Sequence, residues 1–321
     1  MRSLRRNSIV GAFAVALVFF LGSFGMIAAQ GCYGPSGATC SWGPGGLALY
    51  AGYFTHSKGA DFSFSAQNQP AGSVSGLRQQ FGLQGIELEM ILSFKLAPPL
   101  GLALGCGYDF PFTVSSEEVV PIAGAASLSR GWRAEPRSGN VHAAVTMDLY
   151  PSLVGLLGIK YEAFQTNFRS ANNGLTVPGG GLDTADLSFN MYNPYIGVVY
   201  STASRGNGPN IQLGLIGFPT LLGNVDYRET VFGGITVGGI AAEGFQGSNS
   251  IGEGYYLNAF GDVSLSALNL VQLGAYAKYE VTNAACSINV GNRNSSLPDV
   301  AYKFDFQKRL WSFGGRLSIP F

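Results

Sequence analysis

The feature that most constrains this chain is an alternation of apolar and polar residues that returns along most of its length. In GIELEMILSFKL, residues 85–96, the even positions are apolar and the odd positions are mostly charged or polar. In VQLGAYAKYEVT, residues 271–282, the odd positions carry most of the apolar side chains. Because successive side chains of a β-strand point to opposite faces, each segment predicts a strand with one apolar and one polar face.

Ten segments show this pattern, and most of them contain 11 to 17 residues. Their approximate spans are 46–56, 80–96, 101–112, 140–150, 153–167, 186–201, 210–222, 252–266, 270–283 and 301–321. Strands of soluble proteins commonly contain about 5–6 residues, whereas a tilted strand that crosses a membrane needs ~9–11. Very short connections, such as Pro151-Ser152, alternate with long polar or glycine-rich ones, which we expect to be loops. The pattern predicts strands that run up and down, with the long loops at one end.

Composition helps to decide what the apolar faces touch. Charged residues make up only 12% of the chain, against a norm of about 25% in soluble proteins. A soluble β-sandwich also alternates, but its outward face is polar and its strands are shorter. Ten broad apolar faces exceed what one core of this size can bury, whereas lipid can cover them, and a closed barrel leaves no unpaired strand edge in hydrocarbon. We therefore predict an all-β fold, a transmembrane antiparallel up-and-down β-barrel of about ten strands, with long extracellular loops and short periplasmic turns.

Two segments depart from simple alternation. In 186–201 the pattern changes at Asn193-Pro194, and because proline cannot donate to a strand ladder we expect a bulge there. In 301–321 the apolar residues occupy even positions at first and odd positions at the end. A second bulge near 308–310 would reconcile the two halves, and the part before it would project beyond the bilayer.

The N-terminus predicts export. A basic stretch, MRSLRRN, is followed by an apolar run that ends in small residues near Ala29. This is the pattern of a secretory signal peptide, which we assign to residues 1–29. Two alternatives remain open, because the run approaches the ~20 residues of a membrane anchor and Cys32 could be a lipoprotein site. We assign 30–45 to a short periplasmic segment and 46–321 to the barrel.

Export implies an oxidising compartment, which bears on the four cysteines. Cys32 and Cys40 bracket the turn-rich stretch YGPSGAT, so we expect a local disulfide between them. Neither a histidine nor a second cysteine pair lies near them, so we predict no metal site. Cys106 lies in an apolar strand phase and Cys286 in an expected loop, and we expect neither to form a disulfide.

The chain ends on WSFGGRLSIPF, which alternates again and places an aromatic ring on its last residue, Phe321. Together with the signal peptide and the strand pattern, this end resembles Gram-negative outer-membrane β-barrel proteins. In that class a C-terminal aromatic residue, with apolar residues at alternate positions before it, forms the signal read by the barrel-assembly machinery. Phe313, Leu317, Ile319 and Phe321 match this signal, whereas Gly315 is smaller than usual. The resemblance implies a bacterial outer-membrane location, with membrane lipid, lipopolysaccharide and the assembly machinery as partners.

Charged residues of the strands gather on the polar phase, which faces the lumen of a barrel. The residues predicted to line the lumen are Glu87, Glu89, Lys95, Asp109, His142, Asp148, Lys160, Glu162, Asp262, Lys278, Glu280 and Arg316. One hypothesis is a pore lining that selects by charge. The other is a lumen closed by ion pairs, because barrels of about eight strands fill with side chains whereas 16 or more leave a channel. We therefore predict a structural barrel or a narrow porin-like passive channel for small solutes.

Some outer-membrane barrels are hydrolases, and the histidines bear on that class. Omptin proteases, which also have ten strands, use an Asp-x-His pair, but neither His56 nor His142 follows an aspartate at that spacing. His142 and Asp148 share a strand phase, but at strand rise they lie about 20 Å apart, too far for a direct pair. We therefore assign no catalytic residue, no cofactor and no metal ligand, and we expect the chain not to be an enzyme.

A different class of function is binding through the extracellular loops. SRGWRAEPRSG, residues 129–139, is the most contact-prone expected loop. It carries Arg130, Trp132, Arg133 and Arg137, and Trp and Arg are enriched at binding hot spots. The same residues could equally lie at the lipopolysaccharide boundary. A surface-exposed binding or adhesion protein therefore stays open as an alternative. The formal net charge is zero and no basic face is evident, so we expect no nucleic-acid partner.

Overall fold

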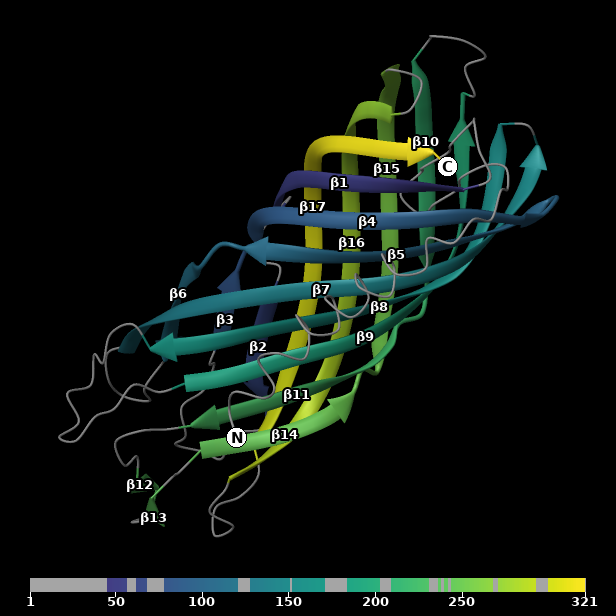
Figure 1. The fold of residues 1–321 in the computed structure, drawn as a ribbon. Helices are drawn as coiled ribbons and strands as arrows, with labels where there is room; N and C mark the ends of the chain where they lie inside the picture. The colour runs from purple at the N-terminus through teal and green to yellow at the C-terminus, as the bar shows by residue number, and fades with distance from the viewer. Residues whose placement is uncertain are drawn as a thin grey trace, which may run out of the picture.

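The computed structural model of the chain is built from β-strands (Figure 1). It describes residues 45–56, 62–67, 78–120, 128–150, 152–170, 184–202, 209–230, 236–237, 240–241, 244–267, 271–292 and 300–320. The expected signal peptide and the Cys32–Cys40 pair lie outside the described residues, as does Phe321. Within those ranges no helix is long and apolar enough to cross a membrane.

Ten long strands form a closed antiparallel ring. They are β1 (Gly45–His56), β4 (Gln84–Ala97), β5 (Leu100–Pro111), β7 (Leu128–Tyr150), β8 (Leu153–Ser170), β9 (Thr184–Ser201), β10 (Asn210–Phe218), β15 (Glu253–Ala267), β16 (Val271–Asn292) and β17 (Val300–Pro320). Each pairs with the next in this order. The ring closes where β17 pairs with β1, from Gly46↔Pro320 to His56↔Leu310. The predicted barrel of about ten antiparallel strands is confirmed.

At one end of the ring the strands continue as an extension of the barrel wall (Figure 1). The far ends of β7, β8, β9, β16 and β17 belong to it, together with shorter strands that pair with them or with one another. These are β2 (Phe62–Gln67), β3 (Arg78–Phe81), β6 (Val114–Val120), β11 (Leu222–Thr230) and β14 (Gly244–Ser250). A small hairpin, β12 (Thr236–Val237) with β13 (Ile240–Ala241), completes the described strands.

For the described residues of the long polar connections, the extension corrects the prediction that they are loops. Residues 129–139, expected to be a contact loop, lie within β7, and Cys286, also expected in a loop, lies within β16. Cys106 and Cys286 are both buried thiols. The strands of the extension were missed because their outer faces meet water rather than lipid, so they lack the apolar-outward alternation that marks the ring.

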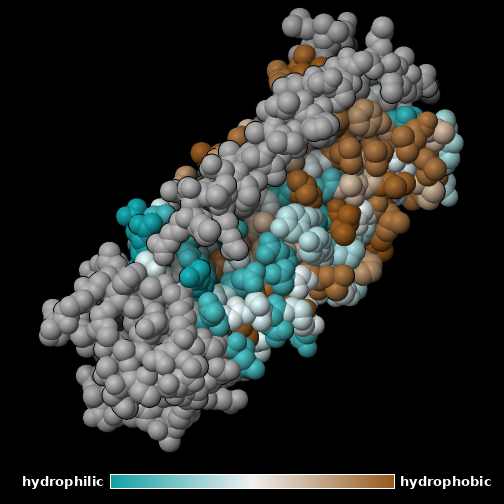
Figure 2. Space-filling model, turned by 60° about the horizontal axis from the view of Figure 1, so that its bottom comes forward, coloured by the Kyte–Doolittle hydropathy of each residue, from teal (hydrophilic) through white to brown (hydrophobic). Residues whose placement is uncertain are grey.

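The outer surface of the ring carries a band of exposed apolar side chains (Figure 2). Towards the extension this band ends in exposed aromatic residues, namely Tyr53, Phe110, Phe112, Tyr192, Tyr255 and Trp311. At the other end lie Tyr150 and Tyr200. An apolar band between two aromatic girdles is the lipid-facing surface of a membrane-spanning barrel. Short turns follow β4 and β7 at the Tyr150 end, and hydrophilic side chains gather on the outer surface beyond the opposite girdle.

In the extension the apolar side chains face the barrel interior instead of the outer surface. The bulge predicted near 308–310 is therefore wrong. β17 pairs with β16 without a register shift from Val300 to Ser318. Phe306 is fully buried inside the barrel, on the same inward phase as Lys308 and Ser312. The apolar residues change parity because apolar side chains face lipid within the membrane but face the barrel interior beyond it. A change of environment, rather than an extra residue, therefore explains the pattern.

The bulge predicted at Asn193-Pro194 is also absent from the ladder between β8 and β9, which runs through both residues in register. The other edge of β9 changes partner at this point. β9 pairs with β11 as far as Tyr192 and with β10 from Ile196 onwards. Pro194 lies at this change of partner, between the part of β9 that pairs with β11 and the part that pairs with β10.

The lipid-facing assignment predicts a large penalty for a charge at Leu157, whose side chain is 64% exposed on β8 within the apolar band. Leu157→Arg is expected to lower the free energy of unfolding by about 2–4 kcal/mol, because arginine is poorly solvated by hydrocarbon. Gln165→Arg is the matched control, since Gln165 is exposed on the same face of β8 beyond the band. Urea titration in lipid vesicles measures both, and equal losses for the two variants would contradict the assignment.

Candidate functional site

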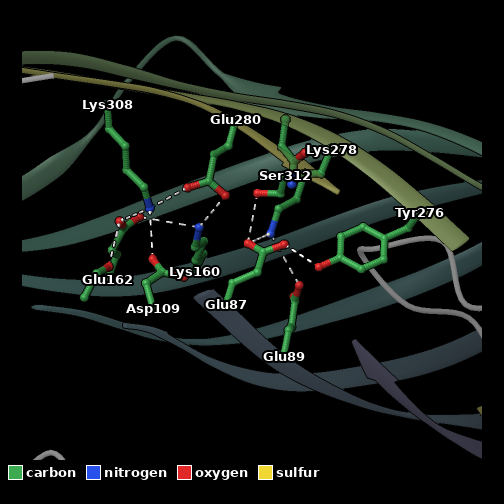
Figure 3. A network of polar contacts seen from close by, with 12 residues as sticks. Glu87, Glu89, Asp109, Lys160, Glu162, Tyr276, Lys278, Glu280, Lys308 and Ser312 are labelled. Carbon is green, nitrogen blue, oxygen red and sulfur yellow. Dashed lines mark hydrogen bonds and ion pairs between the residues drawn. The ribbon is translucent and has the colours of Figure 1, made fainter. Parts of the chain in front are cut away.

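The polar interior of the ring holds two neighbouring sets of ion-paired and hydrogen-bonded side chains, which together we call the lumen network (Figure 3). Its members project inward from β4, β5, β7, β8, β16 and β17. They are Glu87, Glu89, Asp109, His142, Lys160, Glu162, Tyr276, Lys278, Glu280, Lys308 and Ser312. Because these strands lie on different sides of the ring, the contacts between them cross the lumen.

One half of the lumen network centres on Lys308 (Figure 3). Its Nζ lies 2.7 Å from Glu162 Oε1, 2.9 Å from Glu280 Oε1 and 3.6 Å from Asp109 Oδ2. Lys160 joins the same carboxylates, with its Nζ 3.0 Å from Glu280 Oε2 and 3.4 Å from Glu162 Oε2. Two lysines and two glutamates therefore form a ring of ion pairs that ties β8 to β16 and β17 across the lumen.

The other half centres on Lys278, whose Nζ lies 2.9 Å from Glu87 Oε2 and 3.6 Å from Glu89 Oε2. Two hydroxyl groups also donate to Glu87, with oxygen–oxygen distances of 2.6 Å from Tyr276 and 3.0 Å from Ser312. His142 Nε2 lies 3.4 Å from Glu89 Oε1. Glu87 is thus held by three donors, which fixes its carboxylate at the centre of this half.

The lumen network carries more negative than positive charge. Its five carboxylates share three lysines, and the charged side chains and His142 are between 0 and 15% exposed. Removing a charge from water costs several kcal/mol, which only close partners and hydrogen bonds can offset. Each lysine is therefore shared between two or three carboxylates, and the loss of one lysine weakens the compensation of several buried charges at once.

Two further ion pairs lie in the lumen nearer the end that carries the short turns. Arg316 pairs with Asp262, and both side chains are almost completely buried. Lys95 pairs with Asp148 at 3.4 Å, and these side chains are 23% and 26% exposed. The structure thus places eleven of the twelve residues predicted to line the lumen in ion pairs, and it places the twelfth, His142, beside Glu89.

Lys308 is the one charged member of the lumen network that the sequence prediction missed. The bulge expected near 308–310 left its phase unassigned, although uninterrupted alternation back from Ser312 would have placed it inside. Tyr276 was also missed as a lumen residue. Its hydroxyl reaches Glu87 because Gly52 faces it, and a Cβ at Gly52 would overlap that hydroxyl.

Side chains fill most of the remaining interior. On the extension side of the lumen network lies a buried apolar group, which we call the outer cluster. Its members are Phe54, Leu83, Ala134, Phe164, Leu187, Phe189, Met191, Leu221, Val225, Tyr227, Ile251, Ala284, Cys286, Ile288, Phe306 and Leu310. Towards the short turns, Tyr50, Tyr195, Tyr256 and Phe260 are also buried.

A cavity of about 30 Å³ lies within the lumen network. Its walls include His142, Lys160, Tyr195, Asn258 and Lys278. A water molecule needs about 10–15 Å³ by this measure, so the cavity has room for about two. Pockets for small organic ligands are typically ten or more times larger. In the described part of the barrel, side chains of the lumen network and of the outer cluster occupy the interior.

Other predicted functional residues lie on the outer surface or outside the described part of the chain. Phe313 and Ile319 of the expected assembly signal are exposed on the lipid face of β17, and Leu317 is half-buried on the same face. Arg133 and Arg137 lie on the outer face of β7 beyond the apolar band. Arg130 and Trp132 belong to the same strand, but their side chains are outside the described part. Across the described ranges, no group of three His, Cys, Asp or Glu residues could hold a metal ion.

Comparisons with known proteins find the fold but no family. No family model matches the chain, and no curated protein matches it. The outer membrane protease OmpT from Escherichia coli is similar in structure, with a TM-score of 0.59, 8% identity, and coverage of 86% of this chain and 96% of that one. The translocator domain of autotransporter NalP from Neisseria meningitidis gives a TM-score of 0.41 at 12% identity, covering 86% and 88%.

The similarity to a protease corrects one prediction. The expectation that the chain is not an enzyme is contradicted, because a protein named as a protease has a similar barrel. Catalytic groups belong to particular side chains placed on a fold, so a barrel architecture excludes no activity. At 8% identity the likeness carries the fold alone. The chain has the closed antiparallel fold of the bacterial outer-membrane β-barrel proteins.

Proposed function

We propose that this chain is a side-chain-filled outer-membrane barrel that acts as a rigid support for its extension beyond the membrane. The observation that carries the proposal is the occupied lumen. Ion pairs of the lumen network cross the ring, and the outer cluster fills the interior on the extension side. A ten-strand barrel lies near the size at which side chains fill the interior, so this arrangement is expected of a support rather than of an open pore.

A second candidate function, a narrow passive channel, is favoured by the cavity within the lumen network. Charged and polar groups line it, as they line the selective pores of channels. Passage would require the outer cluster to rearrange, because its apolar side chains lie between the cavity and the extension. The two candidates therefore differ in whether the outer cluster opens under a membrane potential.

Conductance of the purified barrel in a planar lipid bilayer distinguishes the two. For the filled support we expect no current steps at either polarity, while heat-modifiable gel mobility shows that the same sample is folded. The positive control is a Phe164→Ala, Phe306→Ala, Lys308→Ala triple variant, which removes side chains from both the outer cluster and the lumen network. Steady current steps from the unmodified protein would overturn the support proposal in favour of the channel.

A further inference from the structure

We propose that the cavity within the lumen network binds one small monovalent cation, such as sodium, beside Tyr195 and Asn258. Such a cation supplies positive charge that the side chains around the cavity lack. The site is compatible with both candidate functions, because a bound ion can remain inside a filled barrel or lie within a narrow channel.

The cavity lies where the two halves of the lumen network meet (Figure 3). Lys160 and Glu280, from the half centred on Lys308, form part of its wall, and so do Glu89 and Lys278 from the other half. The side chains of these four residues are between 6 and 15% exposed. An ion in the cavity would therefore be held mainly by protein groups rather than by bulk water.

The charges of the lumen network do not balance. Five carboxylates and three lysines leave an excess of two negative charges. The remaining ion pairs of the lumen, described above, are each neutral and do not offset this excess. His142, whose Nε2 lies 3.4 Å from Glu89 Oε1, supplies one positive charge when it is protonated. One negative charge is then left in a buried position, where it is costly, and a single monovalent cation balances it.

Two oxygen atoms are placed to hold the cation. Tyr195 is 1% exposed and Asn258 is 6% exposed, and both side chains line the cavity. Among the residues that the structure describes, neither the Tyr195 hydroxyl nor Asn258 Oδ1 has a hydrogen-bond partner, which is rare for buried polar atoms. The other end of the Asn258 amide is in use, because its Nδ2 donates to the Tyr256 hydroxyl at 3.4 Å. The carbonyl oxygen is therefore the end that is left for a ligand.

These donors suit a small monovalent cation better than a divalent one. Hard cations prefer oxygen ligands, and an amide oxygen, a phenol oxygen and carboxylates line the cavity. In the described ranges no group of three His, Cys, Asp or Glu residues is arranged to hold a metal ion, whereas calcium takes about 6–8 oxygen ligands. Magnesium usually keeps several waters, and the cavity has room for about two. Water alone could bond to the two oxygens, but it would leave the negative charge unbalanced.

Sodium dependence of folding tests the site. The full chain is refolded into vesicles of zwitterionic lipid, and sodium chloride replaces choline chloride at constant total ionic strength, which keeps charge screening the same. Choline is too large for the cavity. Because the cation binds only the folded state, the folding equilibrium constant is expected to rise about tenfold, or about 1.4 kcal/mol, between about 1 mM and about 100 mM sodium. Urea titration measures the constant in each mixture.

Two variants remove the proposed ligands singly. Tyr195→Phe and Asn258→Leu each delete one oxygen with little change in volume, and each should reduce the sodium effect to about twofold or less. Every variant is compared with itself in the two salts, so a change in its basal stability cancels. Ser264→Ala is the matched control, because Ser264 is a buried hydroxyl of β15 that does not line the cavity. It should keep the full sodium effect.

Three results would overturn the proposal. If the unmodified chain is equally stable in sodium and in choline, the two oxygens bind water alone. If Tyr195→Phe and Asn258→Leu keep the full sodium effect, the cation binds elsewhere. If calcium stabilises the unmodified chain more than sodium does at the same ionic strength, the ligands hold a divalent ion. Should Asn258→Leu fail to fold, Tyr195→Phe decides alone, since it removes only a hydroxyl group.

Discussion

Replacing Lys308 by methionine is expected to lower the free energy of unfolding by about 3–5 kcal/mol. Lys308 is 3% exposed and lies within ion-pair distance of Glu162, Glu280 and Asp109. Methionine fills much of the same volume, so the expected loss comes from three buried carboxylates that lose a shared cation. Urea titration of the folded barrel, followed by tryptophan fluorescence, measures the change.

The charge imbalance of the lumen network supplies the matched control. Asp109→Asn removes a carboxylate whose ion pair with Lys308 is long, at 3.6 Å. Because the lumen network holds more carboxylates than lysines, this change is expected to cost less than about 1 kcal/mol or to stabilise the barrel. A Lys308→Met, Glu162→Gln double variant should recover part of the Lys308→Met loss. Equal losses for Lys308→Met and Asp109→Asn would show that packing, rather than charge compensation, determines the stability of this region.

The ring could be predicted from the sequence because lipid imposes a simple rule on it. Within the membrane every outward side chain faces hydrocarbon, so the apolar phase of each strand is visible, as in residues 85–96 and 271–282. In the extension water replaces lipid, and the apolar side chains turn inward. From Phe306 into the extension, the apolar residues of β17 occupy the inward positions instead of the outward ones. Strands with few large apolar residues, such as β14, show no clear alternation in the sequence. The prediction therefore failed where the solvent of the outer face changed.

The sequence could predict which strand residues point into the lumen, but not which of them form ion pairs with each other. Alternation places Lys160 and Glu280 inward, yet their 3.0 Å contact joins strands on different sides of the ring. Such a contact depends on the register and curvature of every intervening strand, which a one-dimensional pattern does not contain. The pairing of residues 132–139 with β8 was missed for a different reason, because residues 129–139 were expected to form a loop.

A second large effect is expected for Phe306→Ala, which should lower the free energy of unfolding by about 3–5 kcal/mol. Phe306 extends from β17 across the interior and is fully buried. Its ring centroid lies 4.9 Å from those of Phe164 on β8 and Phe189 on β9. Removing this ring deletes contacts with two strands on the far side of the barrel and leaves a cavity in the outer cluster. Phe306→Leu, which keeps most of the apolar volume, is expected to cost less than about 1.5 kcal/mol.

The Phe306→Ala variant also distinguishes two explanations of how the lumen is blocked. If the outer cluster and the lumen network each block the lumen, Phe306→Ala should destabilise the barrel without producing current in a planar bilayer, because the ion pairs of Lys308 and Lys160 still cross the ring. Current steps from Phe306→Ala, with none from Phe306→Leu, would mean that the aromatic rings alone hold the lumen closed. Ions would then pass the lumen network once the rings are removed, so the lumen network would not by itself block the barrel.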